Sequence, residues 1–207
     1  SEALERKTQE KALAFSREQY EVLLSQVSKA IAGVSKKTGE QFFVSLVRSL
    51  SASLGFSFVV IAEVQAENPE RMSTLAVGND KQMSANFTFD IQGTPCENLL
   101  KRRDCFYSEK VAELYPLDTW LRDNKIESYI GVLLLNSAWD ILGVLIACHD
   151  APKKNLTHPR LIFPFFSAMA EAEMERRRYE KAFLKENALV RLSKSIAVAS
   201  NDLPDME

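Results

Sequence analysis

The sequence predicts an α+β fold, because helical patterns at both ends of the chain enclose a middle with the character of a sheet. Residues 13–34 place mostly apolar side chains alternately three and four positions apart, which is the spacing of one helix face. Residues 56–150 contain apolar or alternating segments separated by turn-forming residues. Helical spacing returns near residue 159 and continues to about residue 200.

The helix that precedes the sheet has recognisable ends. Gly39 marks a break after the N-terminal helix, which we assign to residues 1–35. Apolar side chains then recur at helical spacing from Glu40 to Leu54, and Gly55 suits a helix stop. A second helix is therefore expected at the start of the central domain.

Five strands are expected in the middle of the chain. They are residues 56–65, 72–78, 86–91, 128–135 and 141–150. The last two are almost continuously apolar and are joined by a short connection, so they predict a central hairpin that is covered on both faces. Residues 92–126 are expected to hold short helices and loops.

Residues 159–207 predict one long connector helix. Eleven positions from Ile162 to Ala197 alternate in steps of three and four, and eight of them suit an apolar seam. At about 1.5 Å per residue the helix would be roughly 60 Å long, which exceeds a ~100-residue core with a radius of gyration of ~13 Å. Its distal half therefore needs a partner, which we expect to be the same helix of a second chain. The alternative is a helix that folds back on its own core.

One internal similarity bears on this connector. Residues 188–202 match residues 23–37 at six positions, at an offset of 165. Either the match arose by chance between two helical sequences, or residues 188–207 lead into a further, similar module of a longer protein. In both cases the long helix is interpreted as a connector.

The composition argues against several classes of partner. The 207 residues are 46% hydrophobic, enough for one domain with flanking elements, and their formal net charge is −2. That charge gives no overall attraction to nucleic acid or to an anionic membrane. The most apolar segments, residues 129–135 and 141–148, are far shorter than the ~20 residues that span a bilayer. We therefore expect no nucleic acid as partner and no membrane contact within this segment.

The cysteines and the first residues favour a cytoplasmic location. Residues 1–12 are mostly charged and polar, unlike a secretory signal. The three cysteines are odd in number and lack the paired spacing of a zinc site, so they predict neither a disulfide framework nor a metal centre. A reducing cytoplasm is the simplest setting.

Four short blocks identify a family resemblance. They are Gly93–Glu97 (GTPCE), Tyr115–Asp118 (YPLD), Glu127–Val132 (ESYIGV) and Leu142–Leu145 (LGVL). Together with the helix and strand that precede them, they make residues 36–158 resemble a GAF domain, the small sensory domain of many bacterial signalling proteins. Leu133 departs from the proline usual in the family, and the 137–140 hairpin lacks the common glycine. Both departures concern strand detail more than the fold.

The resemblance implies an antiparallel sheet of five to six strands, with the terminal helices on one face and a ligand pocket on the other. It also implies a homodimer formed through the N- and C-terminal helices, and a signal that passes along them to an output domain of the same longer protein. Family members bind cyclic nucleotides, bilins, haem or other small molecules, and some bind nothing known. The resemblance therefore identifies neither the ligand nor a cofactor.

Aromatic residues between positions 87 and 129 are the candidate pocket. The candidates are Phe87, Phe89, Thr94, Cys96, Phe106, Tyr107, Trp120, Ser128 and Tyr129. Such a set suits a mostly apolar cavity, with Thr94 and Ser128 as polar groups that orient a ligand. The alternative is that these side chains simply fill the core.

Cys96 has two interpretations. Thr94 suits a helix N-cap, Pro95 the first helical position and Glu97 the positive end of the helix dipole, so helix initiation explains the neighbours of the thiol. On this interpretation Cys96 packs or lines the pocket. The alternative is a redox thiol paired with Cys105, as in the free methionine sulfoxide reductases of the GAF family, although the surrounding motifs differ from that group.

Other chemistry finds little support in the sequence. The Cys148–His149 dipeptide resembles the bilin attachment site of some relatives but follows the wrong strand, and neither His149 nor His158 stands in a convincing haem site. Phosphate-binding loops, dinucleotide fingerprints and metalloprotease motifs are absent from the sequence. We therefore expect a non-catalytic sensory module. The alternatives are a thiol-dependent redox enzyme and a structural dimerisation module with a filled pocket.

Overall fold

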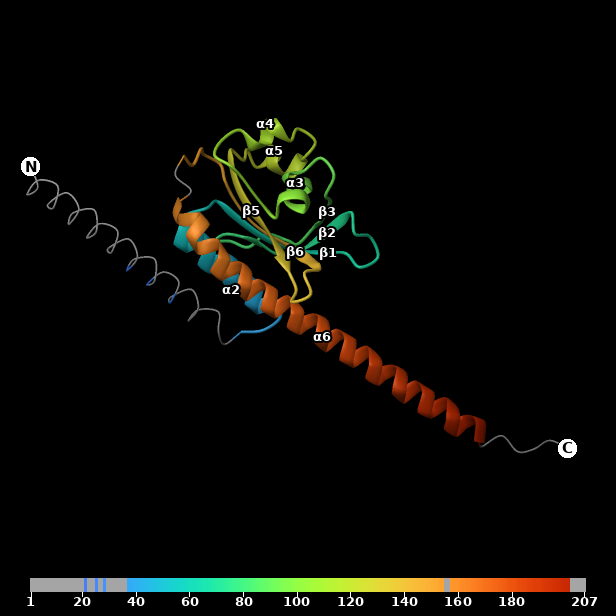
Figure 1. Cartoon of the computed structure of the whole chain (residues 1–207). Helices are drawn as coiled ribbons and strands as arrows, with labels where there is room; N and C mark the ends of the chain where they lie inside the picture. The colour runs from blue at the N-terminus through green and yellow to red at the C-terminus, as the bar shows by residue number, and fades with distance from the viewer. Residues whose placement is uncertain (1–20, 22–24, 26–27, 29–36, 155–156, 202–207) are drawn as a thin grey trace, which may run out of the picture.

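A six-stranded antiparallel sheet forms the centre of the computed structural model, which describes residues 37–154 and 157–201 together with Glu21, Ser25 and Ser28 (Figure 1). The strands are β1 (Phe58–Val64), β2 (Arg71–Gly78), β3 (Thr88–Asp90), β4 (Asp104–Tyr107), β5 (Ser128–Leu135) and β6 (Ile141–His149). The helices are α2 (Glu40–Leu54), α3 (Pro95–Arg102), α4 (Val111–Leu114), α5 (Thr119–Asp123) and α6 (Thr157–Asn201). The N-terminal helix expected within residues 1–35 lies almost entirely outside the described residues.

The strand order β3-β2-β1-β6-β5-β4 places the most apolar strands in the middle. β6 pairs with both β1 and β5, and its residues from Leu142 to Cys148 are all buried. The connection between β5 and β6 spans only residues 136–140, which confirms the hairpin predicted from the sequence. The short strands β3 and β4 form the two edges.

Strand β4 corrects the expectation that residues 92–126 hold only short helices and loops. Asp104–Tyr107 pairs with β5, with Cys105 opposite Gly131. Its four residues alternate between exposed and half-buried, and a run of basic residues (101–103) precedes them. The sequence therefore contains no extended apolar pattern that would predict this strand.

Two glycines bound helix α2, as the sequence predicted. Gly39 has a φ of 64° and precedes the helix, and Gly55 follows it with a φ of 61°, a left-handed conformation that favours glycine. The Gly55 N–H donates to the Ser51 carbonyl at 2.7 Å and closes the last turn. The Gly39 N–H donates to Glu173 Oε1 at 2.5 Å, which joins the start of α2 to α6.

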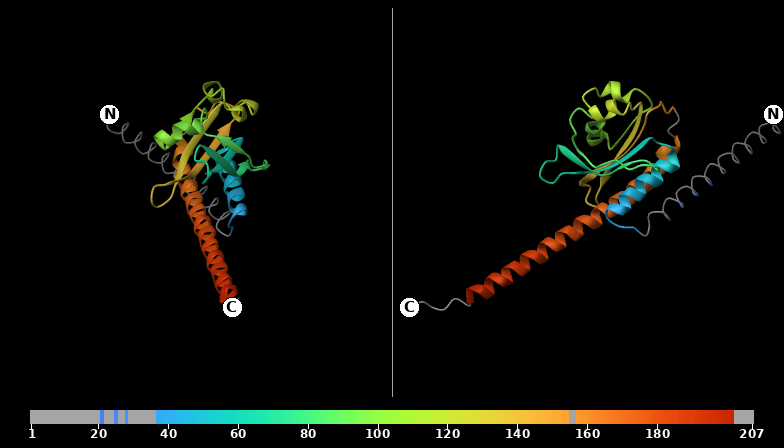
Figure 2. Two further views of the ribbon diagram at one scale, coloured as in Figure 1. Left: turned by 90° about the vertical axis from the view of Figure 1, so that its right-hand side faces the viewer. Right: turned by 180° about the vertical axis from the view of Figure 1, so that it is seen from behind.

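Helices α2 and α6 lie side by side on one face of the sheet, and α3, α4 and α5 cover the other (Figure 2). Each face has its own apolar core. The core beneath α2 and α6 includes Phe43, Leu46 and Phe163, and the core beneath α3 to α5 includes Leu99, Leu121 and Tyr129. This arrangement agrees with the layers that the family resemblance implied.

Helix α6 has two halves of different character. The half that packs on the domain buries Ile162, Phe163, Phe166, Ala170 and Met174. The predicted seam coincides with this face only in part, since Phe165 is 47% exposed. Every side chain from Arg178 to Ser193 is exposed, and this half extends well beyond the domain (Figure 1). No helix among the described residues is long and apolar enough to cross a membrane.

Candidate ligand pocket

A cavity of about 50 Å³ lies between the sheet and the helices α3 and α5. By the same measure one water molecule takes about 10–15 Å³, so the cavity has room for about four. Its lining residues are Val60, Phe87, Phe89, Pro95, Cys96, Asp118, Trp120, Leu121, Tyr129, Ile146 and Cys148. They come from β1, β3, β5 and β6, from α3 and α5, and from the residues just before β3 and α5. The cavity is on the face of the sheet opposite α2 and α6.

The structure brings five of the sequence-predicted residues to this cavity. They are Phe87, Phe89, Cys96, Trp120 and Tyr129. Their ability to bind a ligand stays a prediction, because the same side chains also take part in the core on this face.

The other candidates lie elsewhere. Thr94 caps α3, Ser128 is buried with its Oγ donating to the Ala151 carbonyl at 3.0 Å, and Tyr107 contacts Tyr115. Phe106 is 37% exposed, with the Arg160 guanidinium 4.0 Å from its ring centroid. Thr94 and Ser128, expected as polar groups toward a ligand, thus use their hydroxyls on the backbone.

Aromatic rings form one wall of the cavity. The Trp120 ring stacks on Phe87 with centroids 6.1 Å apart and an interplanar angle of 25°, and it meets Phe58 edge-on at 5.3 Å. The Phe89 ring is 5.8 Å from that of Phe87. Both phenylalanines are half-buried and belong to the edge of the sheet at β3, a strand of three residues. This wall therefore rests on elements that have few partners in the sheet.

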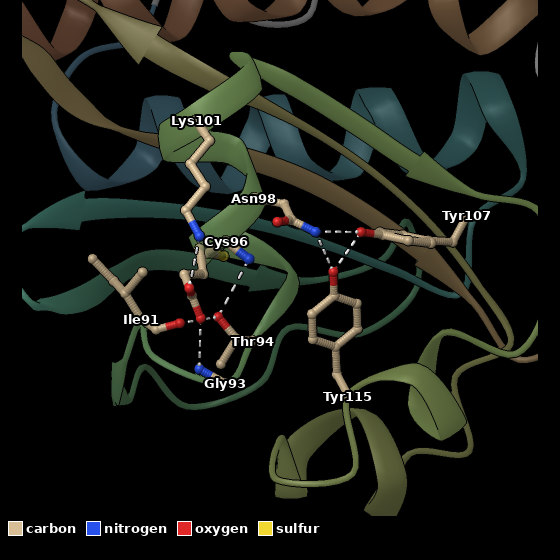
Figure 3. A network of polar contacts seen from close by, with 9 residues as sticks. Ile91, Gly93, Thr94, Cys96, Asn98, Lys101, Tyr107 and Tyr115 are labelled. Atoms are coloured by element: carbon tan, nitrogen blue, oxygen red, sulfur yellow. Dashed lines mark hydrogen bonds and ion pairs between the residues drawn. The ribbon is translucent and has the colours of Figure 1, made fainter.

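The N-terminus of α3 has its donors satisfied (Figure 3). Thr94 Oγ1 accepts from the Cys96 N–H at 3.3 Å and donates to the Ile91 carbonyl at 2.7 Å. Glu97 accepts from the Gly93 N–H at 3.3 Å and from Lys101 Nζ at 2.9 Å. The helix start predicted from Thr94, Pro95 and Glu97 is confirmed.

Burial keeps the cysteine thiols protonated. Cys96 is 2% exposed, with its Sγ 3.7 Å from Tyr129 Oη. Removal from water raises its pKa to about 11, and the same effect raises the pKa of Cys105 to about 12. Burial also raises the pKa of Cys148, and all three cysteines are free. Since the thiolate is the reactive form of cysteine, these environments do not favour a nucleophilic or redox thiol at neutral pH.

Asp118 is the acidic residue of this cavity, and it was not among the pocket candidates predicted from the sequence. Its Oδ1 accepts from the Leu121 N–H at 3.1 Å at the start of α5, and Asp118 is among the residues that line the cavity. Its negative charge helps to raise the pKa of Cys96 and of Cys148, which line the same cavity. Burial raises the pKa of Asp118, although the backbone N–H groups of Leu121 and Trp120 oppose that shift. The sequence carried a weak signal, because Asp118 closes the YPLD block, but the block alone does not show that its last residue lines a cavity.

A second polar cluster lies beside the cavity. Asn98 Nδ2 donates to Tyr115 Oη at 2.6 Å and to Tyr107 Oη at 3.0 Å, and the two hydroxyls are 2.5 Å apart (Figure 3). Burial and the neighbouring Tyr107 hydroxyl raise the pKa of Tyr115. The cluster joins α3, β4 and the segment before α5. The cluster thereby connects the segments of the chain that contain Cys96 and Asp118.

A metal ion held by several side chains finds no support among the described residues. No group of three His, Cys, Asp or Glu side chains in the described part of the chain is placed to hold a metal ion. His149 Nδ1 is 2.9 Å from Ser57 Oγ and 2.5 Å from Asp150 Oδ1, so this ring nitrogen is engaged at the end of β6.

Comparison with known proteins identifies the architecture. No protein-family model matches the sequence, and no curated protein matches it either. Among solved structures, the GAF domain of an Acinetobacter phosphoenolpyruvate-protein phosphotransferase superposes with a TM-score of 0.64 at 9% identity, over 75% of this chain and 94% of that one. The chromophore-binding domain of phytochrome P1 from Stigmatella aurantiaca superposes with a TM-score of 0.57 at 10% identity, over 72% of this chain and 59% of that one. At such identities the likeness concerns the fold alone.

Proposed function

We propose that this chain, which has the fold of a GAF domain, is a non-catalytic sensory module that binds a small molecule and relays its binding through α6. One observation carries the proposal. The cavity and α6 lie on opposite faces of the same sheet, and the β5–β6 hairpin contacts both. A molecule that favours one arrangement of that hairpin would shift the position of α6.

The hairpin begins at the cavity. Tyr129, near the start of β5, and Cys148, near the end of β6, pair with each other in the sheet, and both line the cavity. A bound molecule would therefore contact the two strands at the end opposite their turn.

The other end of the hairpin is tied to α6 by two carboxylates. The Leu135 N–H donates to Glu171 Oε1 at 3.0 Å. The N–H and hydroxyl of Ser137 both donate to Glu175 Oε1, at 2.9 and 2.8 Å. Glu171 and Glu175 are one helical turn apart, immediately before α6 leaves the domain. Movement of the turn would thus shift α6 at the point where its exposed half begins.

The exposed half of α6 supports a homodimer. Its exposed large apolar side chains are Tyr179, Phe183, Leu184, Leu189, Val190 and Leu192, at 45–70% relative exposure. So many apolar side chains are unfavourable on a helix that is surrounded by water. A parallel or antiparallel partner helix would bury them. We propose a second copy of this chain as the partner, a homodimer completed by the N-terminal helix. We also propose a cytoplasmic location and an output domain in the same longer protein.

The raised pKa values of Cys96 and Cys105 count against the thiol-dependent alternative, because that alternative needs a thiolate. The other alternative, a dimerisation module with a filled pocket, differs from the sensory module in one respect. It needs no ligand.

Native mass spectrometry of freshly purified protein tests the proposal. We expect a dimer that retains a small molecule, and we expect Trp120→Ala, which removes one wall of the cavity, to lose the molecule and keep the dimer. A dimer without any bound molecule would support the structural module instead. A sulfoxide reductase activity that Cys96→Ser abolishes would support the enzyme.

A further inference from the structure

We propose that the cavity takes a small organic cation, of the methylated ammonium class, with Asp118 as its counter-ion and the surrounding aromatic rings as its walls. The inference rests on the proposed function, because it names the class of molecule that the same cavity would bind.

The charge of the cavity comes from Asp118. Among the described residues that line it, Asp118 alone carries a charged side chain. None of the described basic side chains forms an ion pair with this carboxylate. A half-buried carboxylate without a cationic partner is unfavourable, and the raised pKa of Asp118 reflects that burial. A bound cation would supply the missing charge.

Aromatic rings supply the second element of recognition. Phe87, Phe89, Trp120 and Tyr129 line the same cavity as the carboxylate. A cation within about 6 Å of such rings is attracted by their π-electrons, and groups of aromatic rings are a recurrent binding site for quaternary ammonium. Rings and one carboxylate together select a cation with apolar substituents over a neutral apolar molecule of the same shape.

Other charged ligands fit less well. The N-terminus of α3 borders the cavity and would be a possible anion site, but Thr94 already accepts from the Cys96 N–H and Glu97 adds a negative charge there. Hard metal ions require six or more oxygen ligands. The side chains of the residues that line the cavity include one carboxylate, that of Asp118, and one hydroxyl, that of Tyr129.

The size of the cavity sets the size of the cation. A volume of about 50 Å³ corresponds to about four water molecules. This room suits a compact cation of the size of tetramethylammonium or choline. A nucleotide or a tetrapyrrole would require the wall formed by Phe87 and Trp120 to move away.

Fluorescence titration tests the inference directly. The chain has two tryptophans, and Trp139 is 68% exposed at the hairpin turn, so Trp139→Phe leaves Trp120 as the sole reporter inside the cavity. In this background the probes are tetramethylammonium, choline and 3,3-dimethylbutan-1-ol, a neutral isostere in which carbon replaces the nitrogen of choline. Concentrations up to about 50 mM detect dissociation constants in the millimolar range and below.

We expect both cations to bind, and the neutral isostere to bind at least about tenfold more weakly. Asp118→Asn keeps an oxygen that accepts from the Leu121 N–H, so it preserves the start of α5 and removes the charge. It should weaken choline binding by at least about tenfold, with no effect on the isostere. Choline binding should also weaken as the pH falls through the raised pKa of Asp118, where the carboxyl becomes neutral.

Three results would overturn the inference: an isostere that binds as tightly as choline, choline binding unchanged by Asp118→Asn, or no cation binding to the wild-type cavity. The comparison of choline with its isostere uses no Asp118 variant, so it decides the matter even if that variant does not fold. A neutral or anionic molecule retained by the purified protein would overturn the cation and leave the sensory function standing. Choline binding that leaves α6 unchanged would overturn the proposed sensory function and leave the cation site standing.

Discussion

Gly143 on β6 offers a sharp test of the sheet that separates the cavity from α6. It pairs with Glu63 of β1 and with Leu134 of β5 at the centre of the sheet. A Cβ atom added at Gly143 would lie 1.9 Å from the Ala62 carbonyl oxygen and 2.9 Å from the Ala62 carbonyl carbon. These are backbone atoms in a paired strand, so no side-chain rotation relieves the clash. We predict that Gly143→Ala forces β1 and β6 apart.

The size of the effect follows from that geometry. Overpacking a well-ordered interior usually costs about 1–3 kcal/mol, and a clash with the backbone belongs at or above the upper end of this range. We therefore expect Gly143→Ala to reduce the free energy of unfolding by about 3 kcal/mol or more. For a chain of this length each kcal/mol lowers Tm by about 2–4 °C, so Tm should fall by at least about 6 °C. Urea unfolding at constant protein concentration, followed by circular dichroism, measures the change.

Gly131→Ala is the matched control. The substitution is the same, on the neighbouring strand β5, but the closest atoms to the new Cβ belong to side chains, at 2.9 Å on Tyr129 and 3.0 Å on Leu99. Because these side chains are able to shift, the loss of stability should be smaller, about 1–2 kcal/mol. The displaced Tyr129 should alter the cavity. A Gly143→Ala variant within about 1 kcal/mol of wild type, or less destabilised than Gly131→Ala, would refute the reasoning.

Three further predictions concern the helices and the thiols. Phe183→Glu places a charge among the exposed apolar side chains of α6, so analytical ultracentrifugation should detect a shift from dimer to monomer; a variant as dimeric as wild type would contradict the proposed interface. Burial alone would raise the pKa of Glu173, but Arg176 and the Gly39 N–H together lower it. Its stabilising effect is therefore complete above the ordinary pKa of glutamate and is lost as the pH falls through the lowered value. Glu173→Gln should thus be less stable than wild type at pH 7, and the difference should shrink as the pH falls below the ordinary pKa of glutamate, as measured by urea unfolding. Because its pKa is about 11, Cys96 should react with a thiol reagent at pH 8 at least about a hundredfold more slowly in the folded than in the unfolded protein. Equal reaction rates in the folded and unfolded protein would support the redox interpretation instead.

Local signals in the sequence were enough to predict most of the fold. Gly39 and Gly55 bound α2 because both have a positive φ there, and such positions favour glycine. The hairpin of β5 and β6 was predictable because both strands are buried on two faces and are almost continuously apolar. Strand β4 was not predictable, since only its pairing with β5 makes the alternating segment Asp104–Tyr107 a strand.

The candidate site was predictable in its aromatic part and not in its polar part. Large aromatic residues near the family blocks, such as Phe87 and Trp120, predict a pocket, and the structure places these two at the cavity. Thr94 and Ser128 were expected beside them, but short hydroxyl side chains satisfy nearby backbone groups first. Asp118 reaches the cavity through the tertiary packing of α5, for which the YPLD block gives only a weak signal.

The same limit applies to the contacts between the hairpin and α6. Glu171 and Glu175 look like solvated charges on a long helix, yet they accept from the backbone of Leu135 and Ser137. Separations of 36 and 38 residues give no local signal for such pairs. Their importance to the proposed relay is visible only in the folded chain.

Hydrogen–deuterium exchange tests that relay most directly. Exchange is measured with the cavity filled, by the molecule retained on purification or by choline, and again with the cavity empty. We predict that filling the cavity slows exchange at Tyr129 and Cys148 and also changes it in the turn at residues 135–140 and along residues 171–193. Glu171→Ala together with Glu175→Ala removes both carboxylates that hold the turn to α6. This variant should keep the first effect and lose the change in α6. Protection confined to the cavity, with the turn and α6 unchanged in the wild type, would contradict the account.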